Sequence, residues 1–268
     1  LLRYLSTYPE SLSAGYFTGG LSAVGRSADD IYAACYEQLR AKSLEYYKRF
    51  PGDRVRFAEL AALAKKGEIA TPSGDVVCPS RLRSLGHVLG ASGGAEKLHY
   101  LLEYPHTSRA FRHDLAELLP YGGRNLLYAV IHESSYADGV VTDWSAARTL
   151  PDDFREDPTL LTGEHVMPEW FDTDQELRPW KEVADLIANH PWPKLYDPDV
   201  LRTAEVPCAA AVYHDDAYVP RKFSLETAAL LPQMHAWVTT EYEHNGSNAS
   251  GGAVLDRLIK LAKGEIVR

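Results

Sequence analysis

The chain has 268 residues, of which 45% are hydrophobic and 24% charged, and its formal net charge at pH 7 is -9. This composition fits one globular domain with a large insertion, or two small domains, and the acidic balance argues against nucleic acid or an anionic membrane as a partner, since both bind basic surfaces. No stretch approaches the roughly 18 consecutive apolar residues that a membrane-spanning helix needs.

Residues 1–28 are predicted to form a helix, a turn and a core strand. The helix is indicated by apolar residues that share one helical face: Leu1, Leu2 and Leu5. The strand covers 14–18 and is closed by Gly19-Gly20. The first residues read as the middle of a helix and do not include a methionine, so we expect the polypeptide to begin earlier.

Residues 29–190 are helical in pattern and rich in charge. Asp29-Asp30 is the predicted N-cap of the first helix, because apolar residues at helical spacing follow it. Further helices are predicted over 57–66, 98–103 and 110–119. This segment therefore reads as a large helical insertion.

From residue 191 the pattern changes to alternating strands and helices. Residues 206–213 form a nearly continuous apolar run, which is typical of a strand buried on both faces. A helix over 224–231, a strand over 236–240 and a helix over 254–263 follow. Because strand, helix, strand and helix alternate, the sheet should be parallel, and the fold class is α/β.

The cysteines are few and widely spaced. Cys35, Cys78 and Cys208 form no CxxC pair, so neither a disulfide framework nor a zinc site is predicted. A reducing, cytoplasmic setting is the expectation that follows.

Two titratable residues follow the two late strands. Asp216 comes after the first strand and His244 after the second. Sites in open parallel sheets lie past the carboxyl ends of strands, and in α/β hydrolases the nucleophile, acid and histidine occur in that chain order. Asp216 would then hold the imidazole of His244, which would move the proton of a serine. The alternative is that Asp215-Asp216 is ordinary turn chemistry and His244 a surface residue.

A serine motif in the helical segment is a second candidate for the nucleophile. Residues 90–94, Gly-Ala-Ser-Gly-Gly, satisfy the G-x-S-x-G pattern of a nucleophile elbow. An elbow needs a buried strand directly before its serine, and residues 84–89 make a poor strand. We therefore expect Ser92 to lie in the insertion, away from His244, with Gly90 ending one helix and Ser92 capping the next.

Several segments together carry a resemblance to a known family. Residues 206–220 read VPCAAAVYHDDAYVP, and residues 237–246 read WVTTEYEHNG. Residues 132–139 read HESSYADG, and residues 162–165 read TGEH. With residues 1–20, these segments resemble the proline iminopeptidases, a family of α/β-hydrolase serine peptidases. The first two resemble the family's acid and histidine segments, the next two resemble motifs of its helical cap, and residues 1–20 resemble the helix after the nucleophile and the next core strand.

The resemblance implies an α/β-hydrolase core interrupted by a helical cap. Residues 1–28 and 191–268 would supply core segments, and 29–190 the cap. The nucleophile elbow and the oxyanion loop would lie before Leu1, so a missing N-terminal segment of the same fold is an expected partner. No metal or organic cofactor is implied. A sheet without its early strands would leave the strand at 14–18 exposed, so we expect another segment against it.

The two cap motifs supply candidate substrate-binding residues, Glu133 and Glu164. An aminopeptidase must bind a free N-terminal amine, and two buried carboxylates facing one ammonium would select for it. An apolar slot for proline would be lined by nearby aromatic residues: Tyr136, Trp144, Trp170 and Phe171. The alternative is that both acids lie on exposed helix surfaces.

The function that these features imply is a serine hydrolase that releases N-terminal proline, or a similar residue, from small peptides or amides through an acyl-enzyme. Two alternatives stay open. One is an esterase or amide hydrolase of secondary metabolism on the same fold, since a fold does not determine a substrate. The other is a non-catalytic fragment that binds its missing half.

Overall fold

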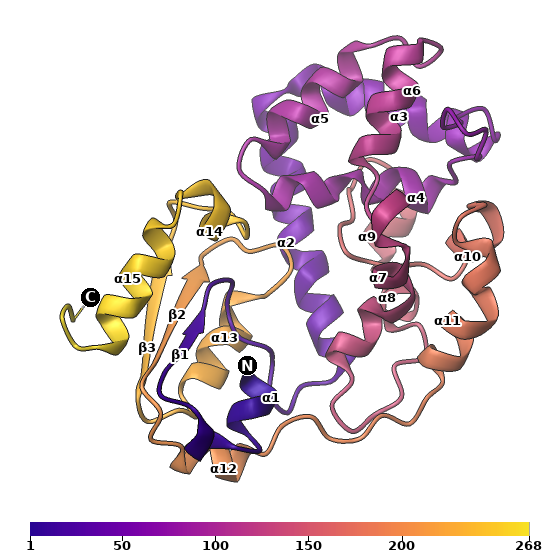
Figure 1. The fold of residues 1–268 in the computed structure, drawn as a ribbon. Coiled ribbons are helices and arrows are strands. Elements are labelled where there is room, and N and C mark those ends of the chain that lie inside the picture. The colour runs from indigo at the N-terminus through magenta and orange to yellow at the C-terminus, as the bar shows by residue number, and fades with distance from the viewer. Residues whose placement is uncertain (268) are drawn as a thin grey trace.

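The computed structural model describes residues 1–267 and shows a three-stranded parallel sheet beside a larger group of helices (Figure 1). The strands are β1 (Gly15–Phe17), β2 (Cys208–Tyr213) and β3 (Met234–Thr239), in the order β1-β2-β3. Gly15 lies opposite Cys208 and Cys208 opposite Met234, and both pairings are parallel. The predicted mixture of helices with a parallel sheet is therefore confirmed.

Strand β2 is the centre of the core, and all six of its residues are buried. Its alternate side chains reach opposite faces of the sheet. One face packs against α1 (Leu2–Leu5), α12 (Pro198–Thr203) and α13 (Arg221–Ala228). The other packs against α15 (Ala253–Ala262). Both faces are covered, as the continuous apolar run of β2 predicted.

Between β1 and β2 the regular elements of residues 1–267 are helical, apart from one antiparallel bridge between Ala70 and Val76. We call residues 28–188 the helical region. Its α-helices are α2 (Ala28–Arg49), α3 (Pro51–Lys65), α4 (Pro79–Arg83), α5 (Gly94–Glu103), α6 (Arg109–Leu118), α7 (Leu126–Ile131), α8 (Ser145–Arg148), α9 (Asp152–Glu156), α10 (Trp170–Thr173) and α11 (Lys181–Ala188). Its 3-10 helices are η2 (Ser84–Gly90), η3 (Gly123–Asn125), η4 (His132–Tyr136) and η5 (Arg178–Trp180). Outside it lie η1 (Pro9–Ser11) and α14 (Gly246–Ala249).

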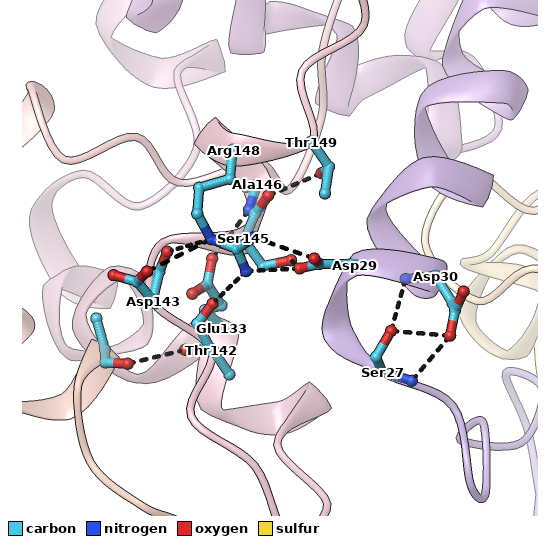
Figure 2. A network of polar contacts seen from close by, with 11 residues as sticks. Ser27, Asp29, Asp30, Glu133, Thr142, Asp143, Ser145, Ala146, Arg148 and Thr149 are labelled. Atoms are coloured by element: carbon cyan, nitrogen blue, oxygen red, sulfur yellow. Dashed lines mark hydrogen bonds and ion pairs between the residues drawn. The ribbon is translucent and has the colours of Figure 1, made fainter.

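Two helix caps differ from the sequence-based expectation. Ser27 is the N-cap of α2, because its hydroxyl accepts from the Asp30 amide while the Asp30 carboxylate accepts from the Ser27 amide (Figure 2). Asp30 thus completes a capping box from the third helical position. Gly90 does end η2, but Gly93, with φ at 76°, is the N-cap of α5, so the predicted cap at Ser92 is wrong.

Strand β1 is an edge of the sheet, since within residues 1–267 it pairs with β2 only. The expected open edge is therefore present, and its coverage by another segment stays a prediction. None of the helices in the same residues combines the length and apolar character that crossing a bilayer requires.

Candidate active site

The turns that follow the three strands meet at the carboxyl edge of the sheet. Gly19 follows β1, Asp216 follows β2 and His244 follows β3. Gly19 lies directly against the imidazole, because a Cβ added there would be 3.1 Å from Cε1 of His244. Parallel pairing thus brings together residues from the beginning and the end of the chain, at the edge where α/β proteins place their sites.

Asp216, and not Asp215, contacts His244. Its Oδ2 lies 2.8 Å from Nδ1 of the imidazole, and its side chain is fully buried. The other oxygen, Oδ1, accepts from the backbone amides of Tyr218 and Val219, both at 2.9 Å. Asp215 is exposed and pairs with His214 instead. The backbone therefore holds the Asp216 carboxylate in one orientation toward the imidazole.

The environment of His244 favours its protonated form. Burial lowers the pKa of the imidazole, but the hydrogen bond and charge of Asp216, with the charge of Glu164, outweigh burial and raise it above its usual value. Within residues 1–267 no hydrogen bond is made to Nε2. This arrangement leaves Nε2 available to exchange a proton with a reacting group.

A cavity of about 260 Å³ lies beside His244. Its apolar lining comes from the turns after β1 and β2, from the helical region and from α13, and it includes Leu21, Ile31, Tyr128, Tyr136, Tyr218 and Phe223. Its titratable lining is His132, Asp138, Glu164 and His244. A small pocket that combines apolar walls with a few polar groups is typical of a site for a small molecule.

Glu164 is the predicted acid that the structure places in this cavity. Its Oε2 lies 3.3 Å from Nε2 of His132, and the other ring nitrogen of His132 lies 3.4 Å from the Tyr32 hydroxyl. Burial opposes ionisation of Glu164, but the hydrogen bond and charge of His132, with the charges of His87 and His244, lower its pKa overall. An ionised carboxylate that lines a small cavity is suited to binding a cation.

Glu133 lies elsewhere. Its Oε2 accepts from the amide of Ala146 at 3.1 Å, at the start of α8 (Figure 2), and its Oε1 is buried without a hydrogen-bond partner in the described chain. It does not line the cavity. The structure thus places Glu164, and not Glu133, at the cavity, because Glu133 accepts from a backbone amide at the start of α8.

Of the four aromatic residues predicted to line the proline slot, one lies at the cavity and three do not. Tyr136 lines the cavity, whereas Trp144, Trp170 and Phe171 pack into a hydrophobic cluster of the helical region. The indole N–H of Trp170 donates to Ser80 at 2.8 Å, so this ring is committed to the core. The predicted slot is wrong for these three residues. The sequence reasoning missed His132 and Tyr218, although His132 opens one quoted motif and Tyr218 follows Asp216 by two positions.

Ser92 lies in the helical region, and its hydroxyl is not hydrogen-bonded to His244. Its amide donates to Oδ1 of Asn245 at 3.0 Å, so Ser92 adjoins the residue that follows His244. Ser92 is exposed, does not line the cavity, and its hydroxyl makes no hydrogen bond to the imidazole. In residues 1–267 no group of three or more His, Cys, Asp or Glu side chains is arranged to hold a metal ion.

Comparison with known proteins identifies two relatives, although no protein-family model matches the chain. Proline iminopeptidase of Aeromonas sobria is 38% identical over 97% of this chain and 63% of its own length. Proline iminopeptidase aneH of Aspergillus aculeatus is 24% identical over 99% of this chain and 62% of its own length. The chain thus spans less than two thirds of either relative. The resemblance that the motifs indicated is confirmed: over nearly its whole length this chain is similar to these two proline iminopeptidases.

Proposed function

We propose that this chain is the acid- and histidine-bearing part of a serine hydrolase that removes N-terminal proline, or a similar residue, from small peptides or amides. The observation that carries the proposal is the Asp216–His244 pair beside a cavity that also contains Glu164. In this proposal residues 1–28 and 191–268 belong to an α/β-hydrolase core, and 29–190 form its cap. The three free cysteines support a reducing, cytoplasmic location.

The proposed chemistry assigns one proton route to His244. Nδ1 donates to Asp216, so neutral Nε2 accepts the proton of a serine hydroxyl while the serine oxygen attacks the carbonyl carbon. The imidazolium then returns this proton to the leaving amine, and an acyl-enzyme remains. Water, deprotonated by His244, hydrolyses the ester and frees the serine. The serine and the oxyanion donors would come from a segment outside residues 1–268, which is the proposed partner of this chain.

The amine of the substrate would be bound by one carboxylate, Glu164, and not by two. An ammonium in the cavity would gain a charge-assisted hydrogen bond from it. An acylated nitrogen carries no charge and would leave the buried carboxylate without that partner. The cavity thus favours a free N-terminus, and its aromatic walls favour an apolar first residue.

The activity is tested in the catalytically complete enzyme, by which we mean this chain together with the segment that carries its serine. We expect prolinamide to be hydrolysed and N-acetylprolinamide to resist hydrolysis. Hydrolysis of short-chain esters with no activity on prolinamide would favour the esterase alternative. Binding of the missing segment with no hydrolysis of either substrate would favour the non-catalytic alternative.

The position of the nucleophile is a separate prediction. A fluorophosphonate reagent should label a serine outside residues 1–268, because Ser92 is exposed and makes no hydrogen bond to His244. Peptide mapping of the labelled enzyme by mass spectrometry locates the adduct. The enzyme with Ser92→Ala should still be labelled by the fluorophosphonate and should keep its activity. An adduct on Ser92 would make this chain self-sufficient and contradict the assignment.

The raised pKa of His244 predicts the pH dependence of the enzyme. His244 must be neutral to accept the serine proton, so activity is present above its pKa and is lost as the pH falls through it. Because its pKa is raised above the ordinary histidine value of about 6.5, we expect the acid limb of kcat/KM to lie above pH 6.5. A profile measured from pH 5 to 9, with NMR titration of the imidazole, checks this. A limb at or below 6.5 would argue against the Asp216 contact in solution.

A further inference from the structure

The G-x-S-x-G segment packs against the loop that carries His244. We call residues 240–245, between β3 and α14, the histidine loop. The amide of His244 itself donates to the carbonyl of Gly90 at 3.1 Å, and the amide of Ser92 donates to Oδ1 of Asn245 at 3.0 Å. Two consecutive residues of the loop, His244 and Asn245, are thus held by the helical region.

The same segment also contacts the turn that carries Asp216. The Tyr218 hydroxyl donates to the carbonyl of His87, and its ring packs edge-on against the imidazole of His244 with centroids 5.1 Å apart. A Cβ on residue 90 would lie 2.2 Å from the Tyr218 ring, so this close approach requires a glycine. The serine motif that suggested a nucleophile therefore has a structural explanation: its first residue, Gly90, has no side chain and so allows the Tyr218 ring to pack against the backbone.

A third contact comes from helix α2. Nζ of Lys42 lies 2.6 Å from Oε2 of Glu243, the residue directly before His244. The Lys42 side chain is only 8% exposed and that of Glu243 32% exposed. A buried ammonium needs a partner, so this ion pair favours one position of the loop. Burial raises the pKa of Glu243, and Lys42 opposes that effect by stabilising its carboxylate.

We propose that Lys42, Gly90 and Asn245 are positioning residues, through which the helical region holds the histidine loop so that His244 faces Asp216. Three contacts, from α2 and from the 90–92 segment, converge on residues 243–245. Strand β3 anchors the loop only at its first residue. The proposal rests on the proposed function for the catalytic role of His244, but the contacts themselves do not depend on it. It gives the helical region a part in catalysis besides lining the cavity.

The first test removes the ion pair with Lys42→Met in the complete enzyme. We expect kcat to fall by on the order of 10- to 100-fold, as small misplacements of reacting groups do, with KM little changed. Lys42→Arg should restore most of the rate. The matched control is Arg40→Met, which removes the ion pair between Arg40 of the same helix and Asp153 of α9, a pair that includes no residue of the histidine loop.

Titration of His244 by NMR in the 268-residue chain separates positioning from simple charge. Loss of the Lys42 charge, with Glu243 left unpaired, would by electrostatics alone raise the pKa of His244. A loosened contact with Asp216 would lower it. We expect a lower pKa in Lys42→Met, and also in Asn245→Ala, which changes no charge.

The positioning role is contradicted by two sets of results, and a third result bears only on the proposed function. If both variants lose thermal stability but titrate and turn over like Arg40→Met, the contacts only hold the fold together and the inference is wrong. If the complete enzyme has no aminopeptidase activity, the proposed function fails, while the titration still tests the positioning. A raised pKa in Lys42→Met with an unchanged one in Asn245→Ala would also overturn the inference.

Discussion

Asp216→Asn should lower kcat of the complete enzyme by about 10⁴-fold, the loss seen when the acid of a serine triad becomes an amide. The asparagine oxygen can still accept from the amides of Tyr218 and Val219, so the turn after β2 should keep its shape. Its NH₂ group would then face Nδ1 of His244. The imidazole would have to accept there and carry its proton on Nε2, the wrong tautomer for a general base.

The matched control for this variant is Asp215→Asn. Asp215 is exposed and pairs with His214, so the same chemical change one residue earlier should leave kcat within about twofold, as for most surface substitutions. Steady-state kinetics on prolinamide and an NMR titration of His244 measure both effects. In Asp216→Asn the imidazole should titrate at a lower pH, since the hydrogen bond and charge that raise its pKa are gone. Equal activity of the two variants would remove Asp216 from the mechanism.

Glu164→Gln should weaken the transition-state binding of free-amine substrates by on the order of 2 to 5 kcal/mol, roughly 30- to 5000-fold in kcat/KM. The amide keeps the volume and the contact with His132 but loses the negative charge that the ammonium needs. A substrate without the amine should be affected far less. The measurement is the ratio of kcat/KM for prolinamide to that for a simple ester.

Glu133→Gln is the control for Glu164→Gln. Glutamine can still accept from the Ala146 amide at the start of α8, and the cavity is not altered because Glu133 does not line it. We expect the amine-to-ester ratio to stay near that of the unaltered enzyme. If Glu133→Gln instead changes this ratio as much as Glu164→Gln, both carboxylates bind the substrate amine. The assignment of amine binding to Glu164 alone is then wrong. Equal losses on both substrates in Glu164→Gln would mean that it supports the pocket and does not bind the amine.

The sheet and the two residues at its edge were predictable from the sequence. The apolar run at 206–213 indicated a buried strand, and alternation of strands with helices indicated parallel pairing, both of which the structure has. Parallel pairing then dictates that residues following neighbouring strands meet at one edge. Asp216 and His244 could be placed side by side for that reason, without knowledge of any side-chain contact.

In the helical region no comparable rule predicts from chain order which residues meet. Its side-chain contacts were decided by tertiary packing. Glu133 and Glu164 are both acids in quoted motifs, but one caps α8 and the other enters the cavity. Trp170 lies in a hydrophobic cluster of the helical region, where its ring is fully buried and its indole N–H finds a partner in Ser80. Nor could the sequence show that Gly90 meets Tyr218, since that contact joins segments far apart in the chain. The sequence by itself determined the strand positions, their parallel pairing and the residues at the sheet edge, because periodicity and chain order suffice there. Which side chains surround His244 from the helical side was decided by the packing of whole helices against one another, which no local pattern encodes.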